Sequence, residues 1–330
     1  MDKNIINLLS AIGMILIIAV SISGCTGSAS TNATSIPAQA SNPNTIRIGI
    51  SPSDTQNVIN AYTPLKDYLQ KETGYDIELD KCIDDSVVFN EMQSKKIEVA
   101  FTGPIAYGSS YTAAGYGDPS TRGKGEAFGI GVDENGNTTR YAYIVSTPEV
   151  AQALGITTPL RGKEGMTTLK ADLEGHKNEY SFKWGDTSSS YAFGMQRLTM
   201  DDVGMKLSDL TTKTGFASSQ VSAVTGVSEN TTDISTVSSV IFDNLTSGGA
   251  INSSNVKILW ISDPVQNPPV YYRSDLPQDV KDKLENAILN APAEVIKPTG
   301  ISHYKSCDNS TYADMPAIAT RLGKIASIGE

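Results

Sequence analysis

Two periods of apolar side chains alternate along most of the chain. Short stretches with the alternating or continuous apolar pattern of strands occur at 46–50, 75–79, 97–101, 141–145, 180–184, 233–242 and 256–261. Apolar residues at helical spacing occur at 58–73, 85–92, 191–205, 221–227, 280–291 and 313–325. Because the first elements run strand, helix, strand, helix, strand, the pattern predicts an α/β fold with a parallel sheet.

The residues at the ends of the first predicted helices support these boundaries. Ser53 and Gln56 have capping-box spacing just before the first helix, and Gly74 is suited to end it. Asp84 and Asp85 can cap the short helix that follows.

The residues that could bind a ligand lie at two breaks in the apolar pattern. The apolar strand at 97–101 runs into the Gly-Pro pair at 103–104, a turn that exposes backbone N–H groups close to Tyr107. The hydroxyl-rich stretch 185–191 stands directly before a helical pattern, which favours an oxyanion held at a helix N-terminus. Neither stretch is a catalytic motif, so together they favour a protein that binds a small anion and does not catalyse its reaction.

The N-terminal segment predicts export. A weak basic start at Lys3 precedes an apolar run from Ile5 to Val20, and residues 22–25 resemble the lipobox of prokaryotic lipoproteins. We therefore expect 1–25 to be a lipoprotein signal peptide with lipid on Cys25; an uncleaved anchor or a simple secretory signal is the alternative. In either case the folded part lies outside the cytoplasmic membrane, anchored at its outer face if Cys25 is lipidated.

Residues 26–45 predict a flexible tether. They are rich in Ser, Thr, Ala and Asn and show no apolar period. A chain of this length has an r.m.s. reach of about 25 Å. Such a flexible tether would let a lipid-anchored domain rotate and dock on a membrane partner.

Composition excludes several classes of function. The net charge of −10 and the pI of about 4.8 argue against a nucleic-acid partner. Two histidines, His176 and His303, stand in unrelated polar surroundings, and no spacing of His, Cys and carboxylates resembles a metal site. We expect no metal and no cofactor.

Two further features leave alternatives open. After Cys25 the only cysteines are Cys82 and Cys307, which could pair in an oxidising compartment, although spacing alone does not show it. Sequons for N-glycosylation begin at Asn32, Asn137, Asn230, Asn244, Asn252 and Asn309. In an exported chain they are candidate modification sites on surface loops.

The order of these motifs resembles the phosphonate and phosphite substrate-binding proteins of ABC importers, the PhnD-like family. The resemblance covers most of residues 46–290. It includes the stretches 48–52, 64–74, 97–107 with its Gly-Pro-x-x-Tyr element, 141–145, the Ser-rich turn at 188–190, and Ala223, Val224 and Gly226. The Gly-Pro-x-x-Tyr element is the most specific of these matches.

The resemblance implies a type II periplasmic-binding fold, in which two α/β lobes joined by two crossovers hold a ligand in the cleft between them. We place lobe one at 46–143 plus 257–330 and lobe two at 144–256. Such a pair of lobes closes on its ligand by a hinge motion.

The resemblance also implies site residues. Tyr107 matches the ligand-facing Tyr that follows Gly-Pro, although a Tyr at this place can simply pack at a lobe surface. Ser189, Ser190 and Tyr191 align with a Ser-Thr-Ser turn that binds phosphonate oxygens, unless the register shifts by one to Ser188, Ser189 and Ser190. A plain helix cap is the structural alternative for this turn. Ser51, at the end of the first strand, completes the candidates on this side.

Three positions matter for the choice of ligand. Asp85 stands where the family has a second ligand-binding Tyr, and a carboxylate there repels an oxyanion unless a proton or a ligand amine intervenes. The alternative is a helix cap that points away. Ser218 replaces a Glu that engages the ligand's amine, and Asp233 is matched to a later family Asp. Phosphite, a phosphonate without an amine, phosphate or another oxyanion all remain open.

These observations favour a monomeric, lipid-anchored solute-binding component of an ABC importer, with a small anionic ligand and a membrane permease as partners. One alternative is a receptor that reports the ligand to a membrane signalling protein. Another is a surface glycoprotein without a small ligand. An enzyme is disfavoured, because no acid–base pair or nucleophile is evident.

Overall fold

The computed structural model describes residues 44–51, 58–83, 85–113 and 125–327. The predicted signal peptide, Cys25, residues 26–43 of the tether, the capping box at Ser53 and Gln56, and Asp84 lie outside the described residues, and Thr45, the last residue of the predicted tether, begins the first strand. Within the described ranges, no helix combines the length and the apolar content needed to cross a membrane.

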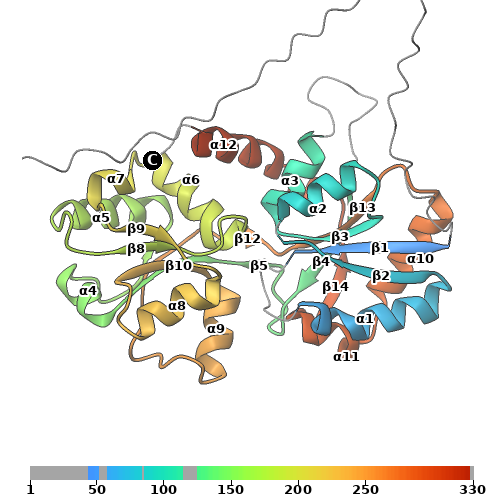
Figure 1. Cartoon of the computed structure of the whole chain (residues 1–330), viewed down its shortest axis with the longest axis horizontal. Helices are drawn as coiled ribbons and strands as arrows, with labels where there is room; N and C mark the ends of the chain where they lie inside the picture. Colours follow the sequence, from blue (N-terminus) through green and yellow to red (C-terminus); the bar gives the residue numbers. More distant parts are fainter. Residues whose placement is uncertain (1–43, 52–57, 84, 114–124, 328–330) are drawn as a thin grey trace, which may run out of the picture. The chain divides into compact units, whose positions relative to one another are not determined.

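Two six-stranded sheets organise the chain (Figure 1). Sheet one has the order β14-β4-β13-β3-β1-β2, with β1 Thr45–Ile50, β2 Asp76–Lys81, β3 Val99–Phe101, β4 Gly125–Val132, β13 Pro269–Arg273 and β14 His303–Ser306. Sheet two has the order β7-β11-β6-β10-β8-β9, with β6 Ala142–Ser146, β7 Leu160–Arg161, β8 Phe182–Trp184, β9 Thr214–Phe216, β10 Ile234–Ser238 and β11 Lys257–Ile261. We call the parts built on these sheets lobe one and lobe two.

Helices cover both faces of each sheet. Those packed on sheet one are α1 Val58–Thr73, α2 Asp85–Gln93, α3 Pro104–Ala113, α10 Gln278–Leu289, α11 Ala293–Ile296 and α12 Met315–Ser327. Those of lobe two are α4 Pro148–Ala153, α5 Gly162–Glu174, α6 Met195–Asp202, α7 Leu207–Leu210, α8 Gln220–Ser228 and α9 Ser239–Ser247. Short turns of other helix types are Ser190–Gly194 (π), Lys297–Thr299 and Asn309–Tyr312 (both 3₁₀).

Both sheets are mixed, which corrects the prediction of a parallel sheet. In sheet one, β1 is parallel to β2 and β3, whereas β13 and β14 run antiparallel to their neighbours. In sheet two, β6 lies antiparallel between β10 and β11. The reversed strands β6 and β13 are those that the chain forms directly after it crosses from one sheet to the other.

The crossing itself is a two-stranded ribbon. β5 (Thr139–Arg140) leads from β4 of sheet one to β6 of sheet two, and β12 (Val265–Gln266) leads back from β11 to β13. The two segments pair antiparallel, with Arg140 opposite Val265. Residues 257–261, placed in lobe one from the sequence, therefore belong to sheet two, because β11 pairs with β6.

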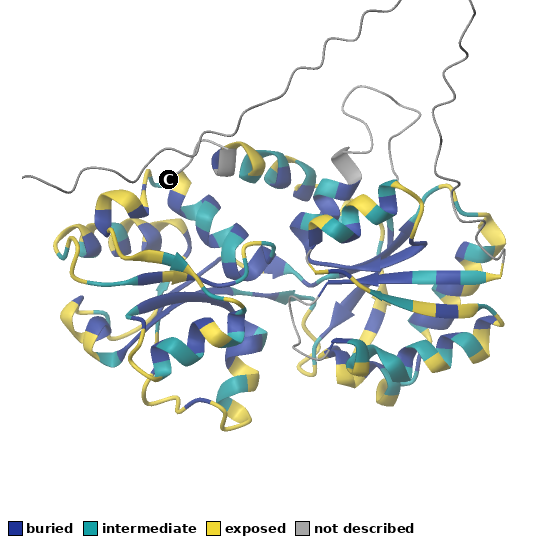
Figure 2. Ribbon diagram, in the orientation of Figure 1, coloured by how far each residue is buried: buried dark blue, intermediate teal, exposed yellow. Residues whose placement is uncertain are grey.

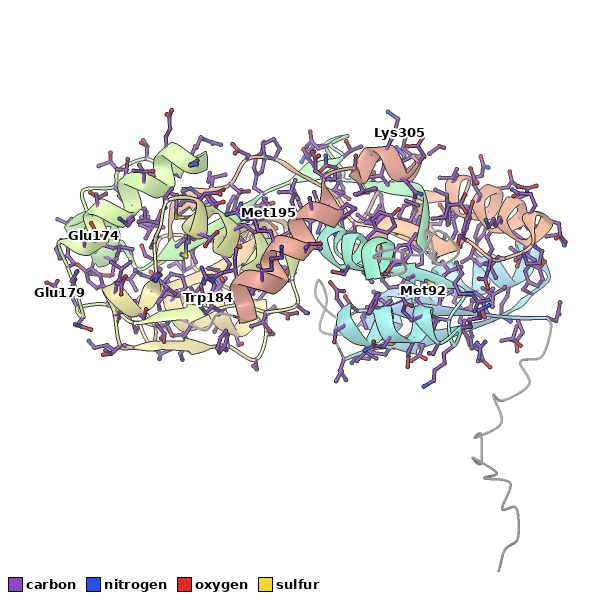
Figure 3. The ribbon with its side chains drawn as sticks, turned by 90° about the horizontal axis from the view of Figure 1, so that it is seen from above. Met92, Glu174, Glu179, Trp184, Met195 and Lys305 are labelled. Carbon is purple, nitrogen blue, oxygen red and sulfur yellow. The ribbon has the colours of Figure 1, made fainter. Side chains whose placement is uncertain are left out.

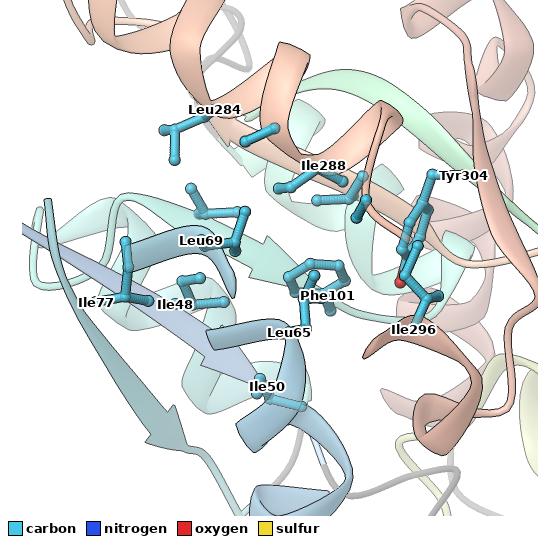
Figure 4. Packing of buried hydrophobic residues seen from close by; sticks show 14 of the residues in the cluster. Ile48, Ile50, Leu65, Leu69, Ile77, Phe101, Leu284, Ile288, Ile296 and Tyr304 are labelled. Atoms are coloured by element: carbon cyan, nitrogen blue, oxygen red, sulfur yellow. The ribbon is translucent and has the colours of Figure 1, made fainter. Parts of the chain in front are cut away.

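The core follows the amphipathic pattern of the sequence. Figure 4 shows Leu65 and Leu69 of α1 packed over Ile48 and Ile50 of β1, each at most 1% exposed. Burying one such side chain contributes roughly 1.5–3 kcal/mol to folding. The helix ends as predicted before Gly74, whose φ of 74° suits glycine. Figure 2 shows the resulting division into buried strands and exposed outer helix faces.

Two predicted elements change type in the structure. The strand predicted at 233–242 stops at Ser238, whose side chain accepts from the Ile241 N–H and caps α9. The helix predicted at 191–205 opens with the π-turn Ser190–Gly194 before α6 begins. In both places a serine hydroxyl satisfies backbone donors and so sets where the helical segment starts.

The last helix contacts both lobes. α12 packs along α3, and Arg321 near its end pairs with Asp201 and Asp202 at the end of α6, at 2.6 Å each. Figure 3 shows α12 beside the α6 residue Met195, which packs in the same apolar cluster. The C-terminal helix thus connects the lobes at a place separate from the β5–β12 ribbon.

Candidate functional site

The two lobes meet at the first turn of α3. Pro104 begins this helix, where its missing N–H costs nothing, and the N–H of Ile105 donates to Oγ of Ser190 in lobe two at 3.1 Å. A Cβ on Gly103 would lie 2.6 Å from Ser190 Oγ and 3.4 Å from Asp85 Oδ2. Glycine at 103 leaves room for the close approach of Ser190 Oγ, and the Gly-Pro break brings the α3 N-terminus, Asp85 and the Ser-rich turn together.

The Ser-rich turn of lobe two is held by its own hydrogen bonds. Oγ of Ser189 accepts from the N–H groups of Tyr191 and Ala192 at 3.3 and 3.2 Å. It also accepts from Nε2 of the buried Gln220 at 3.3 Å, and Gln220 Oε1 accepts from Ser238 N–H at 2.9 Å. These bonds fix the backbone of the turn, so that Ser190 points toward α3.

Ser189 and Ser190 belong to both registers left open for this turn, which differ only in Ser188 and Tyr191. Ser189 and Ser190 are buried, and Ser190 faces lobe one. Ser188 is less buried, and its hydroxyl donates to Oδ1 of Asp186 at 2.8 Å, within its own loop. Ser190 is thus the hydroxyl best placed to reach a ligand at α3.

Tyr191 has a different position from the one its alignment implied. Its hydroxyl donates to the carbonyl of Gln266 in β12 at 2.5 Å, and its ring lies 5.0 Å from the guanidinium carbon of Arg140. The side chain therefore ties the Ser-rich turn to the crossing ribbon.

Arg140 was not singled out in the sequence. It is 5% exposed, and its Nε donates to Oδ1 of Asn267 at 2.9 Å. Asn267 in turn donates from Nδ2 to the carbonyls of Gly131 and Asn137, at 2.9 and 3.1 Å. No motif marks an isolated arginine in a two-residue strand, so only the fold reveals that this cation is buried at the crossing.

A cavity of about 30 Å³ opens beside this contact. Its described lining residues are Ser51, Val58, Tyr62, Phe101, Thr102, Gly103, Arg140, Pro268, Thr299, Ile301 and Tyr304. Ser51, predicted as a site residue, is buried here at the end of β1. This volume holds about two water molecules, and its described lining comes from lobe one and the crossing segments, so a larger solute requires these residues to move apart.

A second cavity of about 480 Å³ shares Arg140, Thr299 and Ile301 with the first. It is lined from both lobes, including Lys297 of lobe one and Asp243 of lobe two. Burial raises the pKa of the Asp243 carboxyl. Arg140 thus stands between the small cavity and a wider space.

Tyr107 does not line either of these cavities. Its hydroxyl donates to Oδ1 of Asn309 at 2.5 Å, and its ring packs edge-on against Tyr271 and Tyr312, at centroid distances of 5.0 and 5.3 Å. It lines a separate space of about 240 Å³ with Asn309. We therefore leave Tyr107 out of the site proposed below. The same contact holds the side chain of the Asn309 sequon, which also accepts from Ala127 N–H at 2.8 Å.

The two predicted aspartates lie in different places. Asp85 begins α2, is 5% exposed, and reaches Gly103, so it does not point away from the site. Asp233 accepts from the N–H and the hydroxyl of Ser181 at 2.7 Å each, at the amino end of β10. Ligands of open α/β sheets bind at the carboxyl ends of strands, and the structure therefore does not bring Asp233 to the Ser-rich turn.

The charge of Asp85 acts on its buried neighbours. Burial raises the pKa of Tyr271 to about 12, and Asp85 adds to the rise, while hydrogen bonds with the hydroxyls of Ser110 and Thr102 oppose it. Tyr271 shares these bonds at 3.3 and 3.2 Å. Burial also raises the pKa of Tyr304, against the opposing charge of Arg140. The candidate site therefore has one acidic residue, Asp85, and one basic residue, Arg140, close to the hydroxyl groups of buried side chains.

The cysteines are free thiols in the described part of the chain, and Cys82 donates to Oε2 of Glu91 at 3.3 Å. Among the described residues, Asp80, Cys82 and Glu91 are the one acidic or thiol cluster with ligand atoms within 4.8 Å of one another. Burial and Glu91 raise the pKa of Cys82, which keeps the thiol protonated and weakens it as a metal ligand.

Two lobes, a ribbon of two crossings, and donors that converge from both lobes define a solute-binding protein of the periplasmic-binding type. A family model described as the periplasmic phosphonate substrate-binding protein of ABC transporters matches residues 48–312. The chain therefore belongs to this family, whose members serve in transport outside the cytoplasmic membrane. The family is one of binding proteins and not of enzymes.

Solved structures agree in fold. A binding-protein component of an ABC phosphonate transporter from Pseudomonas aeruginosa aligns over 87% of this chain and 89% of its own, with a TM-score of 0.67 and 17% identity. PhnD1 from Prochlorococcus marinus, in complex with methylphosphonate, aligns over 86% of this chain and 100% of its own, with a TM-score of 0.68 and 14% identity. A Xanthomonas citri protein bound to ATP aligns over 87% and 100%, with a TM-score of 0.64 and 11% identity. At such identities the likeness shows the type II fold, as expected from the sequence.

Proposed function

We propose that this protein captures a small phosphorus oxyanion, such as a phosphonate or phosphite, between the α3 N-terminus and the Ser189–Ser190 turn. The observation that carries the proposal is the convergence at Gly103, where Ile105 N–H of lobe one meets Ser190 Oγ of lobe two. An entering oxyanion accepts from both groups, taking the place that Ser190 Oγ now holds at the helix N-terminus.

The number of donors suits a transport affinity. Hydrogen bonds to a charged group contribute roughly 1.5–3 kcal/mol each. Four or five of them, from Ser190, Ser51, Thr102 and backbone N–H groups, total roughly 6–15 kcal/mol, and most of this range exceeds the roughly 8 kcal/mol of a micromolar complex. The surplus offsets the cost of ordering and of lobe closure.

A thermal-shift screen of a soluble form starting near residue 30 tests this function. The panel contains phosphite, phosphate, methylphosphonate, aminoethylphosphonate, sulfate and several carboxylates. A ligand at about one hundred times its Kd adds roughly 2.7 kcal/mol of stability, which is a shift of about 5–10 °C. Stabilisation by a phosphorus oxyanion, and not by sulfate, supports the proposal. No shift with any phosphorus compound at millimolar concentration refutes it.

We further propose that Cys25 carries the lipid anchor, and that the tethered monomer delivers its ligand to an ABC permease. The family supplies the import role, and the sequence around Cys25 supports the anchor. Detergent phase partitioning of the expressed full chain and its Cys25→Ala variant tests the anchor. We expect the parent chain to enter the detergent phase and, by mass spectrometry, to lack residues 1–24 and carry lipid on Cys25; an unmodified Cys25 in the parent chain would exclude lipidation there.

A further inference from the structure

We propose that Arg140, on the crossing strand β5, binds the phosphorus oxyanion directly and selects its doubly charged form. This inference rests on the proposed function. It assigns the ligand's negative charge to a residue that comes from neither the Gly-Pro turn nor the Ser-rich turn, the two segments to which the sequence pointed.

The position of Arg140 supports this role. Among the described residues that line the 30 Å³ cavity, Arg140 is the one with a positive charge. The other polar groups around it include the hydroxyls of Ser51, Thr102 and Thr299. Gly103, where the two lobes meet, lines the same cavity. A solute that fills this cavity therefore meets a lining that includes both Gly103 and Arg140.

The surroundings of Arg140 hold its side chain in one orientation. Asn267 accepts from Nε at 2.9 Å, and the Tyr191 ring stacks at 5.0 Å from the guanidinium carbon. Arg140 has at least one further interaction besides these. A guanidinium is planar and forked, so fixing Nε and one face also fixes the direction of its terminal donors. A fork of this kind can donate to two oxygens of one phosphorus when the ligand takes the place of the further interaction that Arg140 makes now.

The charge of Asp85 explains why a cation is needed here. Asp85 Oδ2 would lie 3.4 Å from a Cβ on Gly103, so an anion at Gly103 is close to a carboxylate. The chain as a whole carries a net charge of −10. The Asp85 carboxylate and the negative net charge both make the electrostatic free energy of anion binding less favourable, and this effect increases with the ligand's charge. A buried guanidinium in the same cavity offsets that cost, and it does so most for a dianion.

The origin of Arg140 also connects binding to both lobes. Its strand pairs with β12, and Tyr191 joins β12 to the Ser-rich turn through the Gln266 carbonyl. An anion held by Arg140 therefore contacts the ribbon that both lobes share, as well as the lobe-two turn. Binding at this point favours the arrangement in which the lobes approach each other.

The test compares the soluble protein with Arg140→Gln, Arg140→Lys and Lys297→Gln. Lys297 is a matched control, because it lines only the larger cavity and pairs at the surface with Glu134 at 3.8 Å. The probe is methylphosphonate, or the phosphorus oxyanion with the largest thermal shift, titrated by calorimetry. We expect Kd to rise about 100-fold in Arg140→Gln and about tenfold in Arg140→Lys, and to change less than about twofold in Lys297→Gln.

The pH profile separates direct contact from a structural role. Between the singly and doubly ionised forms of the ligand, the affinity of the parent protein rises with pH, and that rise is absent in Arg140→Gln. An equal loss of affinity for both ligand forms, or an unchanged Kd in Arg140→Gln, overturns the inference while the proposed function stands. If Arg140→Gln does not fold, the pH profile of Arg140→Met decides, because this variant also removes the charge, whereas Arg140→Lys keeps it. If the parent protein binds no phosphorus oxyanion, both proposals fail.

Discussion

The two segments that meet at Gly103 are built in opposite ways. The Ser188–Ser190 turn is uncharged, and its orientation comes from hydrogen bonds within lobe two, among Ser189, Gln220 and Ser238. The lobe-one side carries its groups on separate elements: Asp85 on α2, the N–H of Ile105 on α3, and Arg140 on the ribbon. The turn supplies fixed hydrogen-bond geometry, whereas lobe one and the ribbon supply charge.

This difference separates two aspects of recognition. Hydroxyl and amide donors read the shape of a ligand's oxygens, and they are nearly indifferent to its total charge. Charged residues set which ionisation state binds, because their interaction scales with the ligand's charge. Substitutions of uncharged donors should therefore change Kd equally for the singly and doubly charged ligand, whereas substitutions of charged residues should change it unequally. The experiments below run from the largest expected effect to the smallest.

Gly103→Ala blocks the meeting of the two segments. The new Cβ lies 2.6 Å from Ser190 Oγ, so the lobes cannot approach as closely, and we expect affinity for the phosphorus oxyanion to fall about 10- to 100-fold. Gly215→Ala is the control, because its Cβ meets only Lys183 Cγ at 4.0 Å. Calorimetry of both variants measures the effect. Equal affinities of the two would show that closure at Gly103 does not matter.

Ser190→Ala weakens the uncharged segment. The hydroxyl that faces Ile105 N–H is lost, and we expect about a tenfold rise in Kd that is the same for the singly and doubly charged ligand. Ser188→Ala, whose hydroxyl serves only its own loop with Asp186, should change Kd less than about twofold. A larger effect of Ser188→Ala would favour the register in which Ser188, Ser189 and Ser190 bind the ligand.

Asp85→Asn changes the charged segment in the favourable direction. Removing a carboxylate next to Gly103 should tighten binding of the dianion about fivefold and of the monoanion less. Calorimetry across the ligand's second ionisation measures both values. Weaker binding in this variant would instead indicate that Asp85 binds a positive group of the ligand.

Alkaline pH should affect lobe one before lobe two. Burial raises the pKa of Tyr271 and of Tyr143 from 10.0 to about 12, and that of Cys307 from 9.0 to about 12. The unfolded chain releases these protons first, so the stability they contribute is present below pH 9 and lost as the pH rises toward 12. Each buried group accounts for about 1.4 kcal/mol per pH unit in that window.

The described groups of this kind are concentrated in lobe one, which also has buried phenols with raised pKa values at Tyr272, Tyr304 and Tyr312. Both tryptophans of the chain, Trp184 and Trp260, are buried in sheet two. Tyrosine ionisation should therefore rise at a lower pH than the red shift of tryptophan emission. Coincident transitions would show that the lobes unfold as one unit.

Much of the fold could be predicted because its information is local. The spacing of Leu65 and Leu69 predicted α1, and Gly74 its end, since a one-sided apolar stripe and a left-handed residue leave few alternatives. The strand predicted at 233–242 was wrong beyond Ser238, because apolar residues continue into α9 and period alone does not separate the two. The mixed sheets were missed, because strand direction depends on distant pairing.

The candidate site shows the same division. The Ser-rich turn identified Ser190, the family resemblance Asp85 and the end of the first strand Ser51, and the structure places all three around Gly103 and the adjoining cavity. The positions of Tyr107 and Asp233 could not be anticipated, because their partners Asn309 and Ser181 are distant in sequence.

By itself, the sequence determined the family, the alternation of helices and strands, and the two turns that carry backbone donors, because each depends on a few neighbouring residues. Only the tertiary structure decided which groups share one space. Long-range strand pairing brings Arg140 to the crossing ribbon and Ser190 to α3, and no local pattern encodes that meeting. The cation Arg140 could therefore be found only from the fold, whereas Asp85 and the hydroxyl donors could be identified from the sequence.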